Sequence, residues 1–361
     1  MKPKKTAPAV VLFCAATALA AQGRVDLTQV HAPSLEGNRS GESPRRTVAV
    51  YLPPSYNTAP ERRYPVLHLL HGIGGTHADW TRPGSPGPGQ SLQDLMDRGI
   101  AAGAVQELIV VACDQRTSGG GSFYTNSALT GAWEDFTVRD LVGFIDEGYR
   151  TVPDARSRGV AGHSMGGYGA IKLGMKHPDV FAVVYGLSPA VLGFAEDLTA
   201  ANPAYERAAR LRPEELNPRL DMWPPSLLCI GQALSANPQN PPHFCDLPFA
   251  KQDGAMQPTD AHRRWREQMP LYMAANYVEQ LRSLRALRFD TGSDDEYTHI
   301  LATCRAFSAK LAGLGVPHVY EEYNGDHRNR LWGPEGRLAT EVLPFFSRQL
   351  QREAPVRGAH R

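Results

Sequence analysis

Short apolar runs alternate along the chain with longer segments in which apolar residues recur at helical intervals. Several runs are apolar at nearly every position, which is typical of strands buried on both faces of a parallel sheet. We predict strands over residues 47–52, 64–70, 108–113, 181–187, 284–290 and 318–323. The helical spacing predicts helices over residues 92–102, 133–149, 170–177, 297–314 and 335–351. Strands alternating with helices predict an α/β fold with a doubly wound, mostly parallel sheet.

Two segments depart from this alternation. Residues 22–44 are polar and contain glycine, and we expect an irregular lead-in there. Between residues 188 and 287 prolines cluster and the apolar runs are short, which predicts a partly helical insertion without a core of its own. We therefore expect one domain over residues 45–350 that carries a cap at about residues 190–285.

The first residues have the pattern of an export signal. Lysines at positions 2, 4 and 5 precede an apolar run over residues 7–20, and Ala18-Leu19-Ala20 fits a small-x-small cleavage site. The run is shorter than the about 20 residues that a transmembrane helix needs. We predict that residues 1–21 are a signal peptide, that the protein is periplasmic or secreted, and that it has no stable membrane insertion.

The net charge and the cysteines bear on possible partners, disulfides and metal sites. A formal net charge of +1 gives no reason to expect nucleic acid as a partner. Export allows disulfides, and we favour Cys229 with Cys245, which flank a proline-rich loop, whereas Cys113 is expected as a buried thiol. No cysteine has metal-ligand spacing, so we expect neither a metal nor a cofactor.

The stretch Gly162-His-Ser-Met-Gly166 carries the strongest chemical signal. It has the form G-x-S-x-G, with a strand-like entry at Val160-Ala161 and a helix-like exit. A nucleophile elbow is such a strand–turn–helix, with the serine at a strained position on the turn. The alternative is a glycine-rich turn in an ordinary βα unit. We predict that Ser164 is a nucleophile.

A serine nucleophile needs a histidine as base and a carboxylate that orients the histidine. In chains with a nucleophile elbow, the carboxylate follows the serine and the histidine comes last. His327 follows the last predicted strand on a glycine turn, and it is our candidate base. Asp295 and Asp294 both lie on the loop after the penultimate strand, and we favour Asp295, whereas Asp290 belongs to the end of the strand.

The tetrahedral intermediate needs two N–H donors. We expect them from the backbones of Met165, directly after the nucleophile, and of Ile73, with Gly74 as the alternative to Ile73. Trp80 and Tyr124 lie on loops beyond strand ends that should face the site, and we expect them to contact substrate. Four aromatic residues of the cap either line the pocket or anchor the cap: Trp223, Phe244, Phe249 and Trp265.

Four motifs occur together in this chain: His71-Gly-Ile-Gly-Gly75, Gly162-His-Ser-Met-Gly-Gly167, the Asp-x-Gly-x-x-Asp of residues 290–295, and Gly325-Asp-His327. With them the chain resembles the esterase D-like "putative esterase" family of α/β-hydrolases, which includes feruloyl and acetylxylan esterases, S-formylglutathione hydrolases and mycolyltransferases. The likeness covers about residues 45–190 and 284–350. It implies the α/β-hydrolase fold and supports Asp295, which matches the family's triad acid. The long, proline-rich insertion departs from the compact members and leaves the substrate open.

We therefore expect an exported serine carboxylester hydrolase that acts through an acyl-enzyme on aryl or acyl esters, as small molecules or linked to a polymer such as a carbohydrate. One alternative is acyl transfer by the same triad to a sugar or alcohol. Another, from a different class, is a catalytically inactive hydrolase fold that serves as a binding protein. Loss of a triad member would be expected in that case, and all three are present.

Overall fold

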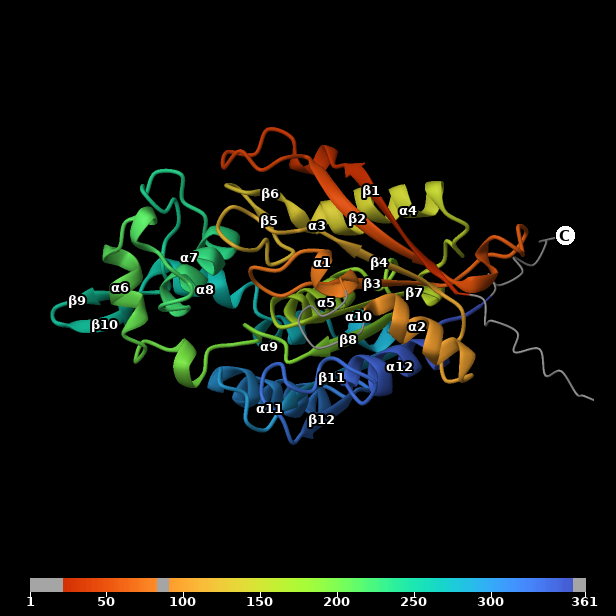
Figure 1. Cartoon of the computed structure of the whole chain (residues 1–361). Helices are drawn as coiled ribbons and strands as arrows, with labels where there is room; N and C mark the ends of the chain where they lie inside the picture. Colours follow the sequence, from red (N-terminus) through yellow and green to blue (C-terminus); the bar gives the residue numbers. More distant parts are fainter. Residues whose placement is uncertain (1–21, 83–90, 353–361) are drawn as a thin grey trace, which may run out of the picture.

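An eight-stranded sheet in the order β1-β2-β4-β3-β7-β8-β11-β12 runs through the protein (Figure 1). The computed structural model describes residues 22–82 and 91–352. Pairs β1–β2 and β2–β4 are antiparallel, and all other neighbours are parallel. The strands are β1 (Arg24–His31), β2 (Arg45–Leu52), β3 (Val66–Leu70), β4 (Ile109–Cys113), β7 (Arg158–His163), β8 (Val183–Leu187), β11 (Ala286–Gly292) and β12 (Val319–Tyr323). The predicted α/β fold with a mostly parallel sheet is confirmed.

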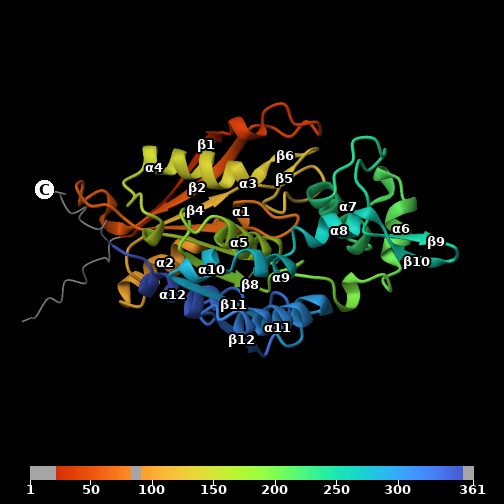
Figure 2. The same cartoon turned by 180° about the vertical axis from the view of Figure 1, so that it is seen from behind.

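Helices cover both faces of the sheet (Figures 1 and 2). One face packs against α2 (Leu92–Ala101) and α12 (Leu343–Gln349), the latter preceded by a π-helical stretch over Leu338–Val342. The other face packs against three further helical segments. These are α3 (Trp133–Asp135), which continues through a π-helical stretch over Phe136–Leu141 into α4 (Val142–Gly148), then α5 (Met165–Lys176) and α11 (Thr298–Gly313). Strands β3, β4 and β8 are buried at every position, as the continuous apolar runs predict.

The expected irregular lead-in is wrong for its first part, because β1 pairs antiparallel with the whole of β2. This strand is at the edge of the sheet, and most of its side chains are partly or fully exposed, with Leu27 66% exposed. A solvated edge strand needs no continuous apolar run, so its polar composition concealed it.

The cap forms a helical unit with one small antiparallel sheet. Its elements are α6 (Ala204–Arg210), α7 (Trp223–Leu234), α8 (Asp260–Arg266), α9 (Pro270–Met273), α10 (Val278–Ser283), β9 (Phe249–Gln252) and β10 (Ala255–Pro258). Figure 1 shows α6, α7, α8 and the β9–β10 sheet gathered at one end of the molecule, with α9 and α10 returning along the body. Buried residues such as Leu227 and Trp265 belong to the same apolar cluster as those of α5 and α11, so the cap shares the core of the domain.

The expected disulfide between Cys229 and Cys245 is not formed, and the four cysteines of the described residues are buried free thiols. Helix α7 separates the two sulfur atoms. Cys245 packs beside Leu228 and Gly231 on one side of α7, whereas the Cys229 thiol points away and donates a hydrogen bond to the carbonyl oxygen of Gly121, with an S–O distance of 3.2 Å. Spacing along a loop could not reveal which side of the helix each thiol takes.

Three short elements lie in the segments that connect the main strands and helices. They are α1 (Ala78–Thr81), β5 (Asn126–Ser127) and β6 (Gly131–Ala132). The predicted signal peptide over residues 1–21 lies outside the described residues. Within the ranges 22–82 and 91–352, no helix is both long and apolar enough to span a membrane.

A buried carboxylate, Glu134 in α3, ties this helix to α5. It forms ion pairs with Lys172, Lys176 and His177, and the Lys172 side chain is fully buried. Burial alone would raise the pKa of Glu134, but these partners outweigh it and hold the pKa at about 2, below the ordinary 4.5.

We expect this pair of helices to lose stability in acid. A carboxyl group whose pKa is lower in the folded state stabilises the fold above its unfolded pKa, and this contribution disappears as the pH falls from 4.5 towards 2. Replacing Glu134→Gln should lower the free energy of unfolding at pH 7 by about 3 kcal/mol, because it removes the carboxylate whose ionised form the three partners stabilise in the fold. Urea unfolding at pH 7 and pH 3 measures this, with the exposed Glu147→Gln as control. A Glu134 effect that is as large at pH 3 as at pH 7 would contradict the assignment.

Candidate active site

Ser164 occupies a strained turn between β7 and α5. Its backbone has φ 58° and ψ −115°, a conformation that costs a residue with a side chain about 1–3 kcal/mol. Three backbone hydrogen bonds hold it there. The Ser164 amide donates to the carbonyl oxygen of Leu187 at 2.9 Å, and the Ser164 carbonyl oxygen accepts from the amides of Tyr168 and Ala190 at 3.0 and 3.1 Å. This is the strand–turn–helix that the G-x-S-x-G pattern predicts.

The elbow requires glycine on both sides of the serine. A Cβ atom at Gly166 would lie 2.0 Å from the Leu70 carbonyl oxygen, and one at Gly162 would lie 2.4 Å from the backbone of Gly166. Each approach is by backbone, which cannot move aside as a flexible side chain can.

Gly166→Ala should therefore destabilise the fold by about 3 kcal/mol, the upper range for overpacking a closely packed site. The matched control is Gly143→Ala in α4, where a Cβ would meet nothing within 4 Å and where alanine favours the helix. Chemical denaturation of both variants measures the difference. Equal stabilities for the two would contradict the close approach at the elbow.

His327 and Asp295 form a buried pair. The distance from His327 Nδ1 to Asp295 Oδ2 is 2.8 Å, and the two side chains are 2% and 0% exposed. The other carboxylate oxygen, Asp295 Oδ1, accepts from the Tyr297 amide at 3.0 Å. Asp294 is exposed, and Asp290 is paired with Arg337 and Tyr185 inside the sheet. Of the carboxylates considered from the sequence, Asp295 is thus the one in contact with the imidazole.

Ser164 and His327 line one cavity between the sheet edge, α7 and α11. In the part of the chain that the structure describes, no direct hydrogen bond joins the Ser164 hydroxyl to the imidazole, which is common in enzymes without bound substrate. Most of the cavity wall is apolar. Its residues are Ile73, Phe123, Ser164, Met165, Ala190, Val191, Leu198, Met222, Trp223, Ser226, Ile230, Tyr297, His299, Ile300, His327 and Arg328.

Both expected oxyanion-hole residues, Ile73 and Met165, line this cavity. Met165 is the first residue of α5, where backbone N–H groups have no partner within the helix. The alternative donor is occupied, because the Gly74 amide donates to the Gly120 carbonyl oxygen at 2.8 Å. The geometry thus favours Ile73 over Gly74.

His71 holds the loop that carries Ile73. Its Nδ1 donates to the Gly72 carbonyl oxygen at 2.8 Å, and its Nε2 accepts from the Gln115 amide at 2.9 Å. Burial lowers the pKa of His71 to about 4, so the ring stays neutral and can accept as well as donate. In the sequence, His71 stands out only as the first residue of the His71–Gly75 motif, and no local signal indicates this positioning role.

His163, directly before Ser164, supports the loop of His327. Its Nε2–H donates to the His327 carbonyl oxygen at 2.7 Å, and the two rings lie 4.6 Å apart between centroids. Burial keeps the pKa of His163 well below its usual value, so no second positive charge forms beside His327. The residue directly before the candidate nucleophile therefore positions the candidate base.

The structure does not place Trp80 and Tyr124 on the cavity, so the expected substrate contacts are corrected. Trp80 in α1 is 2% exposed and packs against Trp332, with ring centroids 5.4 Å apart. Tyr124 is fully buried and donates its hydroxyl to the His71 carbonyl oxygen at 2.8 Å. Both follow strand ends, as expected, but Trp80 packs against Trp332 and Tyr124 packs against Gly169 of α5. Through its hydroxyl, Tyr124 supports the loop that begins at His71.

Of the four cap aromatics, only Trp223 lines the cavity. Phe249 and Trp265 are buried within the cap, where the Trp265 indole donates to Ser235 Oγ at 2.7 Å, and Phe244 is 39% exposed. Apart from the motif residues, the remaining wall comes mainly from the cap and the start of α11, with Phe123 and Arg328 on other loops, and these residues carry no motif. Nothing in their local sequence distinguishes them from core positions, so sequence reasoning missed them.

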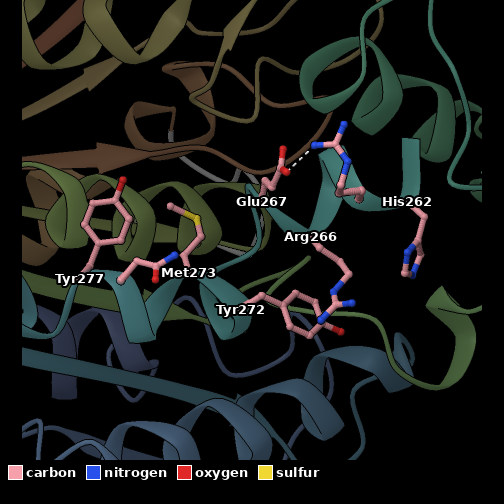
Figure 3. A pocket seen from close by; sticks show the side chains of 8 residues that line it. His262, Arg266, Glu267, Tyr272, Met273 and Tyr277 are labelled. Atoms are coloured by element: carbon pink, nitrogen blue, oxygen red, sulfur yellow. Dashed lines mark hydrogen bonds and ion pairs between the residues drawn. The ribbon is translucent and has the colours of Figure 1, made fainter. Parts of the chain in front are cut away.

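A second, wider hollow of about 620 Å³ lies on the cap surface around α8 and α9 (Figure 3). Arg263 and Glu267 form an ion pair on its wall, and Arg266 lies over the Tyr272 ring. None of Ser164, His327 and Asp295 lines it, whereas Ser164 and His327 line the other cavity. Across residues 22–82 and 91–352, no cluster of three or more His, Cys, Asp or Glu side chains has a metal-binding arrangement.

Solved structures of known proteins share this architecture. A ferulic acid esterase matches with a TM-score of 0.62 at 23% identity, over 91% of this chain and 99% of that one. An S-formylglutathione hydrolase from Agrobacterium tumefaciens matches with a TM-score of 0.59 at 17% identity, over 92% and 97%. The fold is therefore that of the α/β-hydrolases.

The model of the putative esterase family matches residues 42–342, and the chain belongs to that family, as the motifs imply. Among curated relatives, esterase Rv1288 of Mycobacterium tuberculosis is 27% identical over 303 residues, 78% of this chain and 52% of the relative. The chain thus spans about half the length of that relative. An endo-1,4-beta-xylanase/feruloyl esterase of Xylanibacter ruminicola is 30% identical over 139 residues, 38% of this chain and 18% of that protein.

Proposed function

We propose that the protein is an exported serine carboxylester hydrolase that acts through Ser164, His327 and Asp295. The observation that carries the proposal is the buried His327–Asp295 hydrogen bond, formed by a ring that shares a cavity with a serine on a strained elbow. Family membership and the names of the relatives support ester hydrolysis.

The chemistry follows from these positions. The Nδ1–H of His327 donates a hydrogen bond to Asp295, which leaves Nε2 free to take the proton from Ser164 as the serine oxygen attacks the ester carbonyl. The amides of Met165 and Ile73 stabilise the oxyanion. The imidazolium then gives its proton to the departing alkoxide. Water, activated by the same imidazole, releases the acid from the acyl-enzyme and restores the Ser164 hydroxyl.

For the substrate we propose aryl or acyl esters, including esters linked to carbohydrate. The mainly apolar cavity wall with Trp223 and Tyr297 suits an apolar or aromatic group. The relative named as a feruloyl esterase supports this class. The proposed export through residues 1–21 would bring the enzyme to extracellular or periplasmic esters, and N-terminal sequencing of exported protein tests it.

Fluorophosphonate labelling tests the reactive serine. The probe forms a covalent bond only with an activated hydroxyl, so we expect one label per chain, on the peptide that contains Ser164. An unlabelled protein would instead fit the inactive binding protein. Product analysis with and without an added alcohol separates hydrolysis from acyl transfer, because transfer would yield a new ester in place of free acid.

A further inference from the structure

The cavity contains a second histidine–aspartate pair that the proposed triad does not use. His299 is the second residue of α11, and its Nδ1 lies 2.7 Å from Asp197 Oδ1 of the cap. The residue is 4% exposed, and its ring lines the same cavity as Ser164 and His327. The arrangement resembles that of His327 and Asp295 but comes from different elements.

Asp197 fixes both the helix and the ring. Its carboxylate accepts from the amides of Thr298 and His299, each at 2.9 Å, as well as from His299 Nδ1. Burial alone would raise the pKa of Asp197, but the hydrogen bonds from His299 and Thr298 outweigh it and the pKa lies below its usual value. The carboxylate therefore stays ionised at neutral pH and keeps the proton of a neutral His299 on Nδ1.

The other ring nitrogen of His299 is left without a partner. No hydrogen bond to Nε2 is formed by any residue within 22–82 or 91–352, and much of the surrounding wall is aliphatic, including Val191, Leu198, Ile230 and Ile300. A single polar group in the wall of a mainly apolar pocket is the kind of group by which such pockets orient ligands. The missing partner is therefore expected from the substrate.

Aromatic rings connect His299 with the proposed base. Trp223 lies 5.8 Å from the His299 ring and 6.0 Å from Tyr297, and Tyr297 lies 4.9 Å from the His327 ring, all between centroids. A substrate held at His299 Nε2 would thus extend along Trp223 and Tyr297 towards the reacting centre.

We propose that His299 Nε2 accepts a hydrogen bond from a hydroxyl group of the ester substrate, and that Asp197 sets the tautomer that makes this nitrogen an acceptor. This inference rests on the proposed function and adds a specificity residue to it. The enzyme then prefers an ester that carries the O–H donor over the same ester in which that oxygen is methylated or absent.

Matched ester pairs test the preference. One pair is methyl 4-hydroxycinnamate and methyl 4-methoxycinnamate, and the other is methyl 3-hydroxybutyrate and methyl butyrate. We expect the wild type to favour the hydroxylated member of at least one pair by about tenfold in kcat/KM, the upper range for one neutral hydrogen bond. His299→Phe keeps the ring but removes the acceptor, and it should bring this ratio close to one. His299→Gln, which can present an amide oxygen, should restore part of it.

The control is His318→Phe, because the His318 ring bonds to Ser308 and to the Val316 carbonyl oxygen and does not line the cavity. It should leave the ratio unchanged. A wild type without preference in either pair, or a preference that survives in His299→Phe, would overturn the inference.

Asp197→Asn tests the tautomer directly. Its amide NH₂ would donate to Nδ1 and move the ring proton to Nε2, so the cavity atom becomes a donor and the preference for the hydroxylated ester should disappear. Nitrogen-15 chemical shifts of the ring, assigned by their loss in His299→Phe, should show a bare Nε2 in the wild type and a protonated Nε2 in the variant. A protonated Nε2 in the neutral wild-type ring would refute the inference, even if Asp197→Asn were too unstable for kinetics.

Fluorophosphonate labelling of the wild type tests the serine esterase activity separately from the role of His299. Labelling of Ser164 together with equal rates for both members of each pair would leave the esterase assignment intact and overturn only the role of His299. Absence of labelling and of ester turnover would count against the proposed function and, with it, against a substrate role for His299.

Discussion

Ser164→Ala is expected to lower kcat for 4-nitrophenyl acetate by about 10⁶-fold. In the proposed mechanism the serine oxygen forms the covalent bond to the acyl group, and no other hydroxyl lies on the elbow to replace it. What remains would come from oxyanion stabilisation and binding, which do not need the nucleophile. Initial rates with purified variant, corrected for the uncatalysed reaction, measure the effect.

The fold should tolerate this change, because the turn at Ser164 is held by backbone hydrogen bonds. Circular dichroism and thermal unfolding check that point. The control is Ser293→Ala, an exposed serine on the loop that carries Asp295, which should keep wild-type turnover. Activity of Ser164→Ala within tenfold of the wild type would remove Ser164 from the mechanism.

Asp295→Asn is expected to lower kcat by about 10⁴-fold. The asparagine amide would donate to His327 Nδ1, at the position where the carboxylate now accepts at 2.8 Å. The ring proton would then reside on Nε2, which could no longer take the proton from Ser164. Steady-state kinetics across pH 6–9 measure the loss.

The neighbouring carboxylate supplies the matched control. Asp294→Asn removes the same charge one residue away, but Asp294 is exposed and makes no contact with the imidazole, so its kcat should remain within a few-fold of wild type. The sequence left these two residues as alternatives. A larger loss in Asp294→Asn than in Asp295→Asn would reverse the assignment.

The most reliable expectations were those that depend on local pattern. The strand–turn–helix at Ser164 needs glycine at positions 162 and 166, because the backbone comes too close there for a side chain. This signal is contained within a few residues of the sequence. The order of serine, acid and histidine along the chain directed attention to His327 and Asp295, which the structure brings into contact. The buried strands were equally visible, because burial on both faces leaves a continuous apolar run.

The expectations that were wrong concern residues whose environment depends on distant parts of the chain. Strand β1 is an exposed edge strand with a polar composition, and Cys229 and Cys245 lie on different sides of α7. Trp80 and Tyr124 follow strands whose ends face the site, but Trp80 is buried against Trp332 and Tyr124 against α5. In each case the outcome depends on which distant segment packs against the residue.

From its residue order alone, then, this chain specifies an α/β sheet, the elbow at Ser164 and a short set of partners for it, since these depend on apolar periodicity, glycine geometry and loop position. Packing between distant segments decided the rest. Packing brings Asp295, and not Asp294, into contact with His327. It also places His71 and His163 where they hold the loops of the site, and it brings His299 next to Asp197, about a hundred residues earlier in the chain. Side-chain orientation in a cavity results from contacts among many elements, and no single stretch of sequence contains them.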